Sequence, residues 1–151
     1  MLEINTKAPS FTLLDEEGES HSLNDFRGHK VILYFYPRDN TPGCSAQACG
    51  FRDLYPSFIE KDAIVIGISK DSIKSHKKFK EKYNLPFILL SDPNKDVIQA
   101  YDVWKEKKSF GKTSMGVLRT TYLIDEEGII IKAKARVKAA DNAAEMLEAL
   151  S

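Results

Sequence analysis

The chain has 151 residues, of which 42% are hydrophobic and 29% charged, a composition typical of a soluble globular protein. Its 22 basic and 22 acidic side chains cancel, so no overall field favours nucleic acid or an anionic membrane as a partner. No apolar run approaches the roughly 20 residues that a membrane-spanning helix needs. The first residues lack the basic and apolar regions of a secretory signal, and we expect a cytoplasmic protein.

Apolar periodicity and turn residues indicate the order of the elements. The sequence predicts, in chain order, a hairpin of residues 8–13 and 19–23, a strand at 31–36, a helix from 41 or 42 to about 60, a strand at 63–69, a lysine-rich helix capped by Asp71 or Ser72, a strand at 87–90, a short helix at 95–101, a hairpin of 120–125 and 129–133, and a closing helix at 141–150. This order predicts an α/β fold with a mixed central sheet flanked by helices. It is a thioredoxin-like architecture with an N-terminal β-hairpin extension, and we expect residues 1–151 to form a single domain.

The segment that follows Trp104 has the weakest pattern. Residues 105–112 are rich in lysine and follow no apolar period, so we expect a surface loop beside a partly buried aromatic ring. A mobile flap next to a pocket is the alternative interpretation.

The first of two cysteines lies where a strand gives way to a helix. The strand ends at Pro37, Thr41 fits the helix N-cap, and Pro42 fits the first helical position. Cys44 then lies among backbone N–H groups that have no helical partner, where a thiolate is favoured. The Thr41 hydroxyl can donate to a sulfur or a bound oxygen, and Gly43 lets a substrate approach the backbone closely.

The second cysteine, Cys49, follows five residues later. In a regular helix this spacing puts the two Cα atoms about 8.7 Å apart. A disulfide tolerates at most about 7 Å, so either Cys44 and Cys49 never bond or the first helical turns unwind when they do. Two unrelated buried cysteines are the alternative. The scattered histidines 21, 29 and 76 do not suggest a metal site, and none is expected.

These residues resemble the peroxiredoxins. The pattern Pro37-x-x-x-Thr41-x-x-Cys44 looks like the active-site signature of that family. The fuller run 36–53 is similar to the peroxiredoxin Q group, also called bacterioferritin comigratory proteins, and similar motifs extend through residues 23–28, 66–72, 90–93 and 116–125.

The resemblance implies a role for each matched residue. Cys44 would be the peroxidatic cysteine, which attacks hydrogen peroxide or an alkyl hydroperoxide, and Cys49 the resolving cysteine, which then forms a disulfide with it. Thr41 would hydrogen-bond the peroxide and the thiolate, and Arg119 would hold the thiolate and the peroxide oxygens. The substrate pocket would be shaped by Pro37, Pro42 and Gly43. The chain departs from the usual pattern at Ser45, Gln47 and Asp141-Asn142.

The resemblance also implies the partners. A thioredoxin-like dithiol protein would reduce the disulfide, no cofactor would be needed, and the protein would act as a monomer.

Two other functions use the same residues. A dithiol–disulfide oxidoreductase acting on proteins fits the fold, although such enzymes normally use a C-x-x-C pair. A non-enzymatic redox sensor would use the thiol as a switch without repeated turnover.

Overall fold

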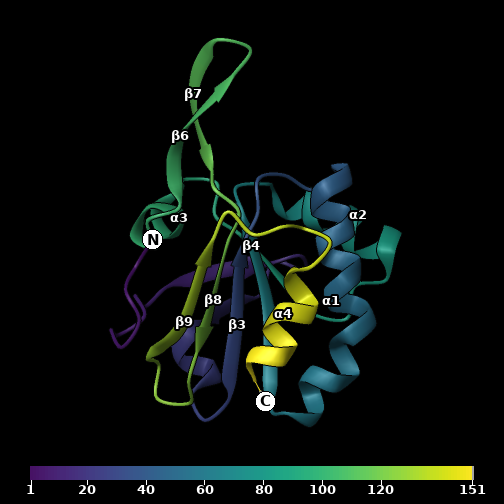
Figure 1. Ribbon diagram of the computed structural model, residues 1–151. Helices are drawn as coiled ribbons and strands as arrows, with labels where there is room; N and C mark the ends of the chain where they lie inside the picture. Colours follow the sequence, from purple (N-terminus) through teal and green to yellow (C-terminus); the bar gives the residue numbers. More distant parts are fainter. Residues whose placement is uncertain (151) are drawn as a thin grey trace.

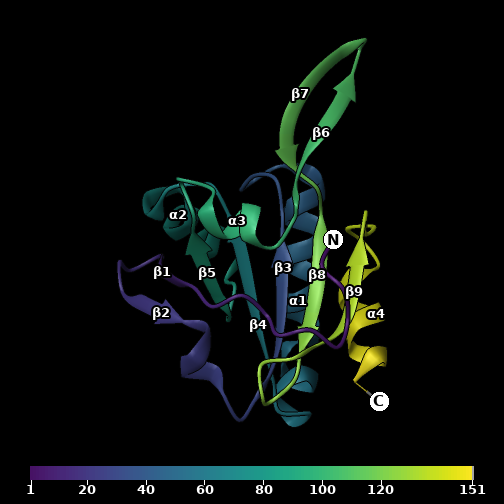
Figure 2. The same ribbon diagram turned by 90° about the vertical axis from the view of Figure 1, so that its left-hand side faces the viewer.

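The computed structural model describes residues 1–150, apart from the side chain of Ser109. A seven-stranded mixed sheet forms its centre, in the order β2-β1-β5-β4-β3-β8-β9 (Figures 1 and 2). The strands are β1 (Thr12–Asp15), β2 (Ser20–Ser22), β3 (Lys30–Phe35), β4 (Ala63–Ser69), β5 (Ile88–Ser91), β8 (Thr120–Ile124) and β9 (Ile130–Ala135). The helices are η1 (Leu23–Phe26, a 3-10 turn), α1 (Pro42–Glu60), α2 (Ile73–Tyr83), α3 (Asp96–Ala100) and α4 (Asn142–Ala149). The predicted order of these elements is confirmed.

The central strand β3 is buried on both faces, as its continuous apolar run predicts. It pairs in parallel with β4 and antiparallel with β8. Its side chains alternate between two hydrophobic clusters, with Ile32 and Tyr34 in one and Leu33 and Phe35 in the other. A strand covered on both sides has no polar face, which explains the missing alternation in the sequence.

Helices cover both faces of the sheet. Phe51 of α1, Phe79 of α2 and Met146 of α4 join the cluster around Tyr34, and α4 lies alongside α1 (Figure 1). Ile98 of α3 joins the opposite cluster. The chain leaves the carboxyl end of β3 and enters α1 after a loop of residues 36–41, which puts the start of α1 at this end of the sheet. Within residues 1–150, no helix is long and apolar enough to cross a membrane.

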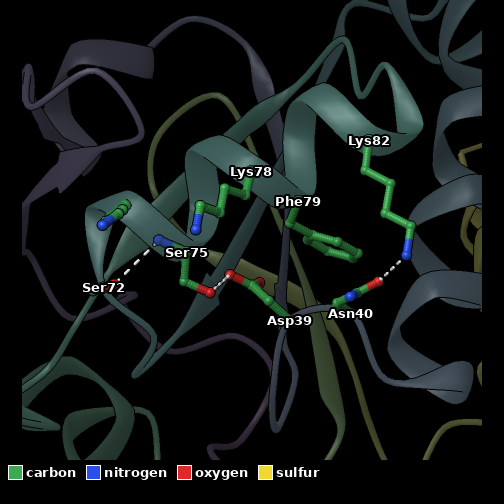
Figure 3. A pocket seen from close by; sticks show the side chains of 8 residues that line it. Asp39, Asn40, Ser72, Ser75, Lys78, Phe79 and Lys82 are labelled. Atoms are coloured by element: carbon green, nitrogen blue, oxygen red, sulfur yellow. Dashed lines mark hydrogen bonds between the residues drawn. The ribbon is translucent and has the colours of Figure 1, made fainter.

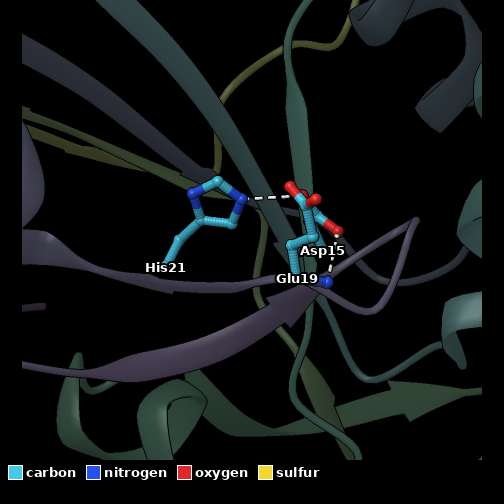
Figure 4. A group of neighbouring side chains, drawn as sticks. All are labelled: Asp15, Glu19 and His21. Atoms are coloured by element: carbon cyan, nitrogen blue, oxygen red, sulfur yellow. Dashed lines mark hydrogen bonds and ion pairs between the residues drawn. The ribbon is translucent and has the colours of Figure 1, made fainter.

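The predicted N-terminal hairpin is confirmed as β1 and β2, although its first strand, predicted at residues 8–13, lies at 12–15, and β1 also pairs with β5. Asp15 holds its turn: the carboxylate accepts the N–H groups of Glu17 and Glu19, and His21 Nε2 lies 2.6 Å from Oδ2 (Figure 4). Burial alone would raise the pKa of Asp15, but these hydrogen bonds outweigh it and lower the pKa. This cluster therefore stabilises the hairpin.

The segment expected as a surface loop or a mobile flap is instead a two-stranded antiparallel ribbon. It consists of β6 (Trp104–Ser109) and β7 (Lys112–Val117), and it projects from the end of the sheet where α1 begins (Figures 1 and 2). Phe110 and Gly111 form its two-residue turn with φ values of 51° and 76°. A turn with two positive φ values matches the twist of a hairpin, but Phe-Gly is not one of its usual sequences. Because both strands are mostly polar, the sequence lacks the alternation of apolar and polar residues that would predict them.

Candidate active site

Cys44 lies in the first turn of α1, with only 2% of its surface exposed. Cys49 lies in the same helix and is half-buried, and both thiols are free. The structure therefore represents the arrangement in which the two cysteines share a helix and not a bond. Their pairing into a disulfide remains a prediction.

Arg119 reaches the Cys44 thiol from just before β8. Its Nη2 donates to Cys44 Sγ at 3.4 Å, and its Nη1 donates to Gln47 Oε1 at 2.6 Å. A fixed guanidinium favours a thiolate over a thiol. Residues 75 positions apart in the sequence thus meet as the resemblance implies.

Gly43 explains how the guanidinium comes so close. A Cβ atom built on Gly43 would lie 3.2 Å from Arg119 Nη2. The sequence suggests that Gly43 lets a substrate approach the backbone. The structure shows that the absent side chain makes room for Arg119.

Thr41 occupies the predicted N-cap, but its hydroxyl does not act as expected. The backbone is extended there (φ −94°, ψ 155°), and its carbonyl accepts the Ser45 N–H at 2.8 Å. The hydroxyl donates to the Arg38 carbonyl at 3.1 Å and makes no capping bond. It is therefore committed to the preceding loop, and the first N–H groups of α1 are left to other acceptors.

Pro37 lines a hollow of about 390 Å³ next to this loop, together with Arg38, Lys70, Asp71, Lys107, Gly116 and Val117. Lys107 comes from the ribbon, which explains why sequence spacing did not suggest it. Burial, together with the charge of Arg119, lowers the pKa of Lys107. The ribbon thus adds a cation close to Cys44.

A buried polar chain extends from Arg119 into the core. Gln47 Nε2 donates to Asn142 Oδ1 at 2.9 Å, and the Thr121 hydroxyl donates to the same oxygen at 2.8 Å. Gln47, Thr121 and Asn142 are completely buried. In the sequence, Gln47 and Asn142 stand out only as departures from the family pattern, and no local pattern predicts that they touch.

A separate cavity of about 430 Å³ lies beside α2 (Figure 3). Its lining includes Lys78, Lys82, Asn40 and the carboxylate of Asp39, but none of the predicted site residues. Lys82 Nζ donates to Asn40 Oδ1 at 2.9 Å, which ties α2 to the loop before α1. Its lysines are exposed, as expected for the solvated face of a helix.

Below this cavity, His76 and Asp39 form a buried ion pair. His76 Nδ1 lies 2.7 Å from Asp39 Oδ2 and Nε2 lies 2.9 Å from the Leu90 carbonyl. Both ring nitrogens face acceptors, so both carry hydrogens. Burial lowers the pKa of His76, but the hydrogen bond and charge of Asp39 outweigh it, and the pKa is raised. Asp39 also accepts the Tyr36 hydroxyl at 2.6 Å, so the loop before α1 is held from two sides.

Comparison with known proteins identifies the family. The AhpC/TSA family model matches residues 4–133. Peroxiredoxin Bcp of Bacillus subtilis is 52% identical over 149 residues, which cover 99% of this chain and 95% of the relative. The chain belongs to the AhpC/TSA family, in its Bcp and peroxiredoxin Q group.

Solved structures of peroxiredoxin Q proteins share the fold. A variant of Xylella fastidiosa PrxQ has a TM-score of 0.94 at 34% identity, covering 99% of this chain and 96% of that one. The Xanthomonas campestris bacterioferritin comigratory protein, studied for its alkyl peroxide reduction activity, has a TM-score of 0.88 at 38% identity, covering 93% and 89%. The predicted thioredoxin-like fold is confirmed.

Proposed function

We propose that this peroxiredoxin is a thiol-dependent peroxidase in which Cys44 attacks hydrogen peroxide or an alkyl hydroperoxide. The contact of Arg119 Nη2 with Cys44 Sγ at 3.4 Å, at the start of α1, is the observation that carries the proposal. Both the helix dipole and the guanidinium favour the thiolate, which is the nucleophilic form. The alkyl peroxide reduction activity of the Xanthomonas campestris relative supports the substrate class.

The first step breaks the O–O bond of the peroxide. The Cys44 thiolate attacks the terminal oxygen, and an S–O bond forms while the other oxygen leaves as hydroxide or alkoxide. With one proton from solvent, the products are a sulfenic acid and water or an alcohol. Arg119 and the N–H groups at the start of α1 stabilise the negative charge that develops on the leaving oxygen.

The other site residues shape this step. Gly43 admits the guanidinium of Arg119, and Pro42 presets the first turn of α1. Pro37 lines the hollow next to the loop before α1, into which Lys107 also extends, and we propose that it shapes the approach to the thiol. The Thr41 hydroxyl donates to the Arg38 carbonyl in this structure, and it would have to leave that acceptor to donate to a peroxide oxygen.

Resolution uses Cys49. Its thiol attacks the sulfenic sulfur, a disulfide forms and water leaves. Because both cysteines lie in α1, the helix must unwind between them before the bond can form. A thioredoxin-like dithiol protein then reduces the disulfide. Sulfur alone carries the two-electron change, so the cycle needs no metal, haem or flavin.

We further propose that residues 1–151 act as a single domain, that the protein works as a monomer and that it acts in the cytoplasm. The continuous sheet through the described residues supports the first point. Size-exclusion chromatography with light scattering, on the reduced and the disulfide form, tests whether the protein is a monomer. A stable dimer in either form would contradict it.

Peroxide consumption coupled to thioredoxin and its reductase tests the mechanism. Cys44→Ser should abolish consumption, and Cys49→Ser should complete one turnover but fail to recycle. Arg119→Ala should slow the first step by about 100-fold, in the range seen when one preorganised donor is lost. Arg27→Ala, a change beside the turn at Gly128, is the matched control and should keep the normal rate.

The same assay separates the two alternatives. A protein oxidoreductase would reduce or form disulfides in protein substrates faster than it consumes peroxide. A redox sensor would be oxidised once without sustained turnover. Activity that survives in Cys44→Ser would contradict the proposed mechanism itself.

A further inference from the structure

The polar chain behind Cys44 has a direction that Arg119 sets. A guanidinium has only donors, so Gln47 must present Oε1 to Arg119 Nη1. Gln47 Nε2 then points at Asn142, which must present Oδ1 to accept it. The Thr121 hydroxyl donates to the same oxygen. The cation thus fixes the orientation of both amides.

This arrangement leaves one buried group unpaired. Asn142 Nδ2 is buried and has no hydrogen-bond partner among the residues that the structure describes. Leaving a buried N–H unpaired costs about 1–3 kcal/mol. Rotating the Asn142 amide would pair it no better, because Nδ2 would then face the Nε2 donor of Gln47. The amide therefore keeps an unfavourable orientation that serves Gln47.

Gln47 lies in α1, one turn after Cys44. Because it lies between the two cysteines, unwinding of α1 from Cys44 to Cys49 would move Gln47 as well. Its bonds to Arg119 and Asn142 break in that step, and both partners lose it together. The bonds exist only while the start of α1 is wound.

We propose that Asn142 is a positioning residue that holds Gln47, and through it Arg119, over the Cys44 thiol, and so stabilises the wound form of α1 against the unwound one. The inference rests on the proposed function. It makes the C-terminal helix α4 part of the control of the cycle. Removing the Asn142 acceptor should impair the peroxide step and favour the disulfide step.

Rapid-mixing kinetics of Asn142→Leu test this. Leucine has a similar volume but accepts no hydrogen bond. We expect the reaction of Cys44 with hydrogen peroxide to slow, and formation of the disulfide from the sulfenic acid to speed up, each by about 3- to 10-fold, the equivalent of one net hydrogen bond. Opposite changes in two steps are not the result of general destabilisation.

Met146→Ala is the matched control. Met146 is buried in α4 and packs in the hydrophobic cluster that also contains Cys44. It takes no part in the polar chain around Asn142. This change should lower the unfolding midpoint without moving the two rates in opposite directions. If Asn142→Leu slows both steps together, or changes neither, the proposal is wrong.

Gln47→Glu provides a second test that leaves no hole in the core. A carboxylate accepts from Arg119 and lets the Asn142 amide rotate, so that Nδ2 takes the place of Oδ1 and donates both to the new carboxylate and to the Thr121 hydroxyl oxygen. The buried N–H of Asn142 is then paired, and the unpaired atom becomes its carbonyl oxygen, which is the less costly of the two. We expect disulfide formation to slow by about 3- to 10-fold while the peroxide step is kept or accelerated. Faster disulfide formation in this variant would overturn the proposal.

The two proposals fail in different ways. If the wild type consumes no peroxide, the proposed function is wrong. If the wild type turns over and both Asn142→Leu and Gln47→Glu match it in each step, only the positioning role is wrong.

Discussion

A missing side chain decides the geometry at the thiol. The Cβ atom of Gly43→Ala would lie 3.2 Å from Arg119 Nη2, so the guanidinium would have to shift by a few tenths of an ångström from its present contact. We expect the peroxide step to slow by about tenfold, since part of a charge-assisted contact is lost, with little change in stability. Stopped-flow kinetics with hydrogen peroxide measure this rate.

Gly50→Ala, in the same helix, is the control. Its Cβ would make an ordinary contact of 3.4 Å with Ala143, and alanine favours a helix interior by about 1 kcal/mol. It should stabilise the protein and leave the peroxide step unchanged. Equal rates in Gly43→Ala and Gly50→Ala would contradict the role of Gly43.

Tyr34 carries a buried hydroxyl without a partner in the described part of the chain. Burial raises the pKa of Tyr34 well above its ordinary value. Tyr34→Phe removes the unpaired group and should raise the free energy of unfolding by about 1 kcal/mol, measured by urea denaturation. Tyr36→Phe should lower it, because the Tyr36 hydroxyl donates to Asp39 at 2.6 Å. A loss of stability in Tyr34→Phe would show that its hydroxyl is paired, for example by a buried water.

At the residue scale, the sequence singled out Cys44 as the candidate nucleophile but did not predict what surrounds it. A thiol at a helix start is a local pattern, so Cys44 could be predicted from its neighbours. Arg119 lies at the start of a strand, where most charges are solvated, and only the family resemblance singled it out. Gln47 and Asn142 are 95 positions apart, and no local pattern predicts their contact.

At the scale of elements, α2 and the loop before α1 are joined by the His76–Asp39 pair. The raised pKa of His76 means that its charged form stabilises the fold. This contribution is complete below pH 6.5, the ordinary value, provided that Asp39 stays ionised, and it decreases as the pH rises through the raised value. Asp71 and Tyr36 also face this pair.

His76→Gln should therefore cost most at mildly acid pH, by about 3 kcal/mol, because it leaves Asp39 buried without its cation. Thermal unfolding of the wild type and the variant from pH 5 to pH 9 measures the difference. The difference in stability between the wild type and the variant should decrease towards pH 9. A difference that is constant across this range would show that folding does not shift the pKa of His76.

Elements with a clear period were predictable, and the ribbon was not. The buried strands β3 and β4 are continuous apolar runs, and α1 has an N-cap threonine with proline after it, so local sequence specifies them. Strands β6 and β7 pair with each other; β6 carries charged residues on both of its sides, and the first four residues of β7 are exposed. A strand without a buried face shows no alternation of apolar and polar residues, so the sequence does not reveal it.

At the scale of the whole molecule, the ribbon is peripheral to the core. Val103 and Val117 at its base are buried, whereas residues 112–115 are exposed. Replacing residues 106–115 by a two-glycine turn should therefore keep the fold and change the unfolding midpoint by only a few degrees. Circular dichroism during heating measures this. A collapse of the cooperative transition would show that the ribbon supports the core.

The ribbon also affects how the protein self-associates at high concentration. Its two strands pair only with each other, so each leaves a row of backbone groups open to a foreign strand. Lysines stand along it at positions 105, 107, 108 and 112. Their mutual repulsion discourages a second copy from extending the ribbon strand by strand. Uncharged residues at these positions should convert this projection into a seed for fibre growth.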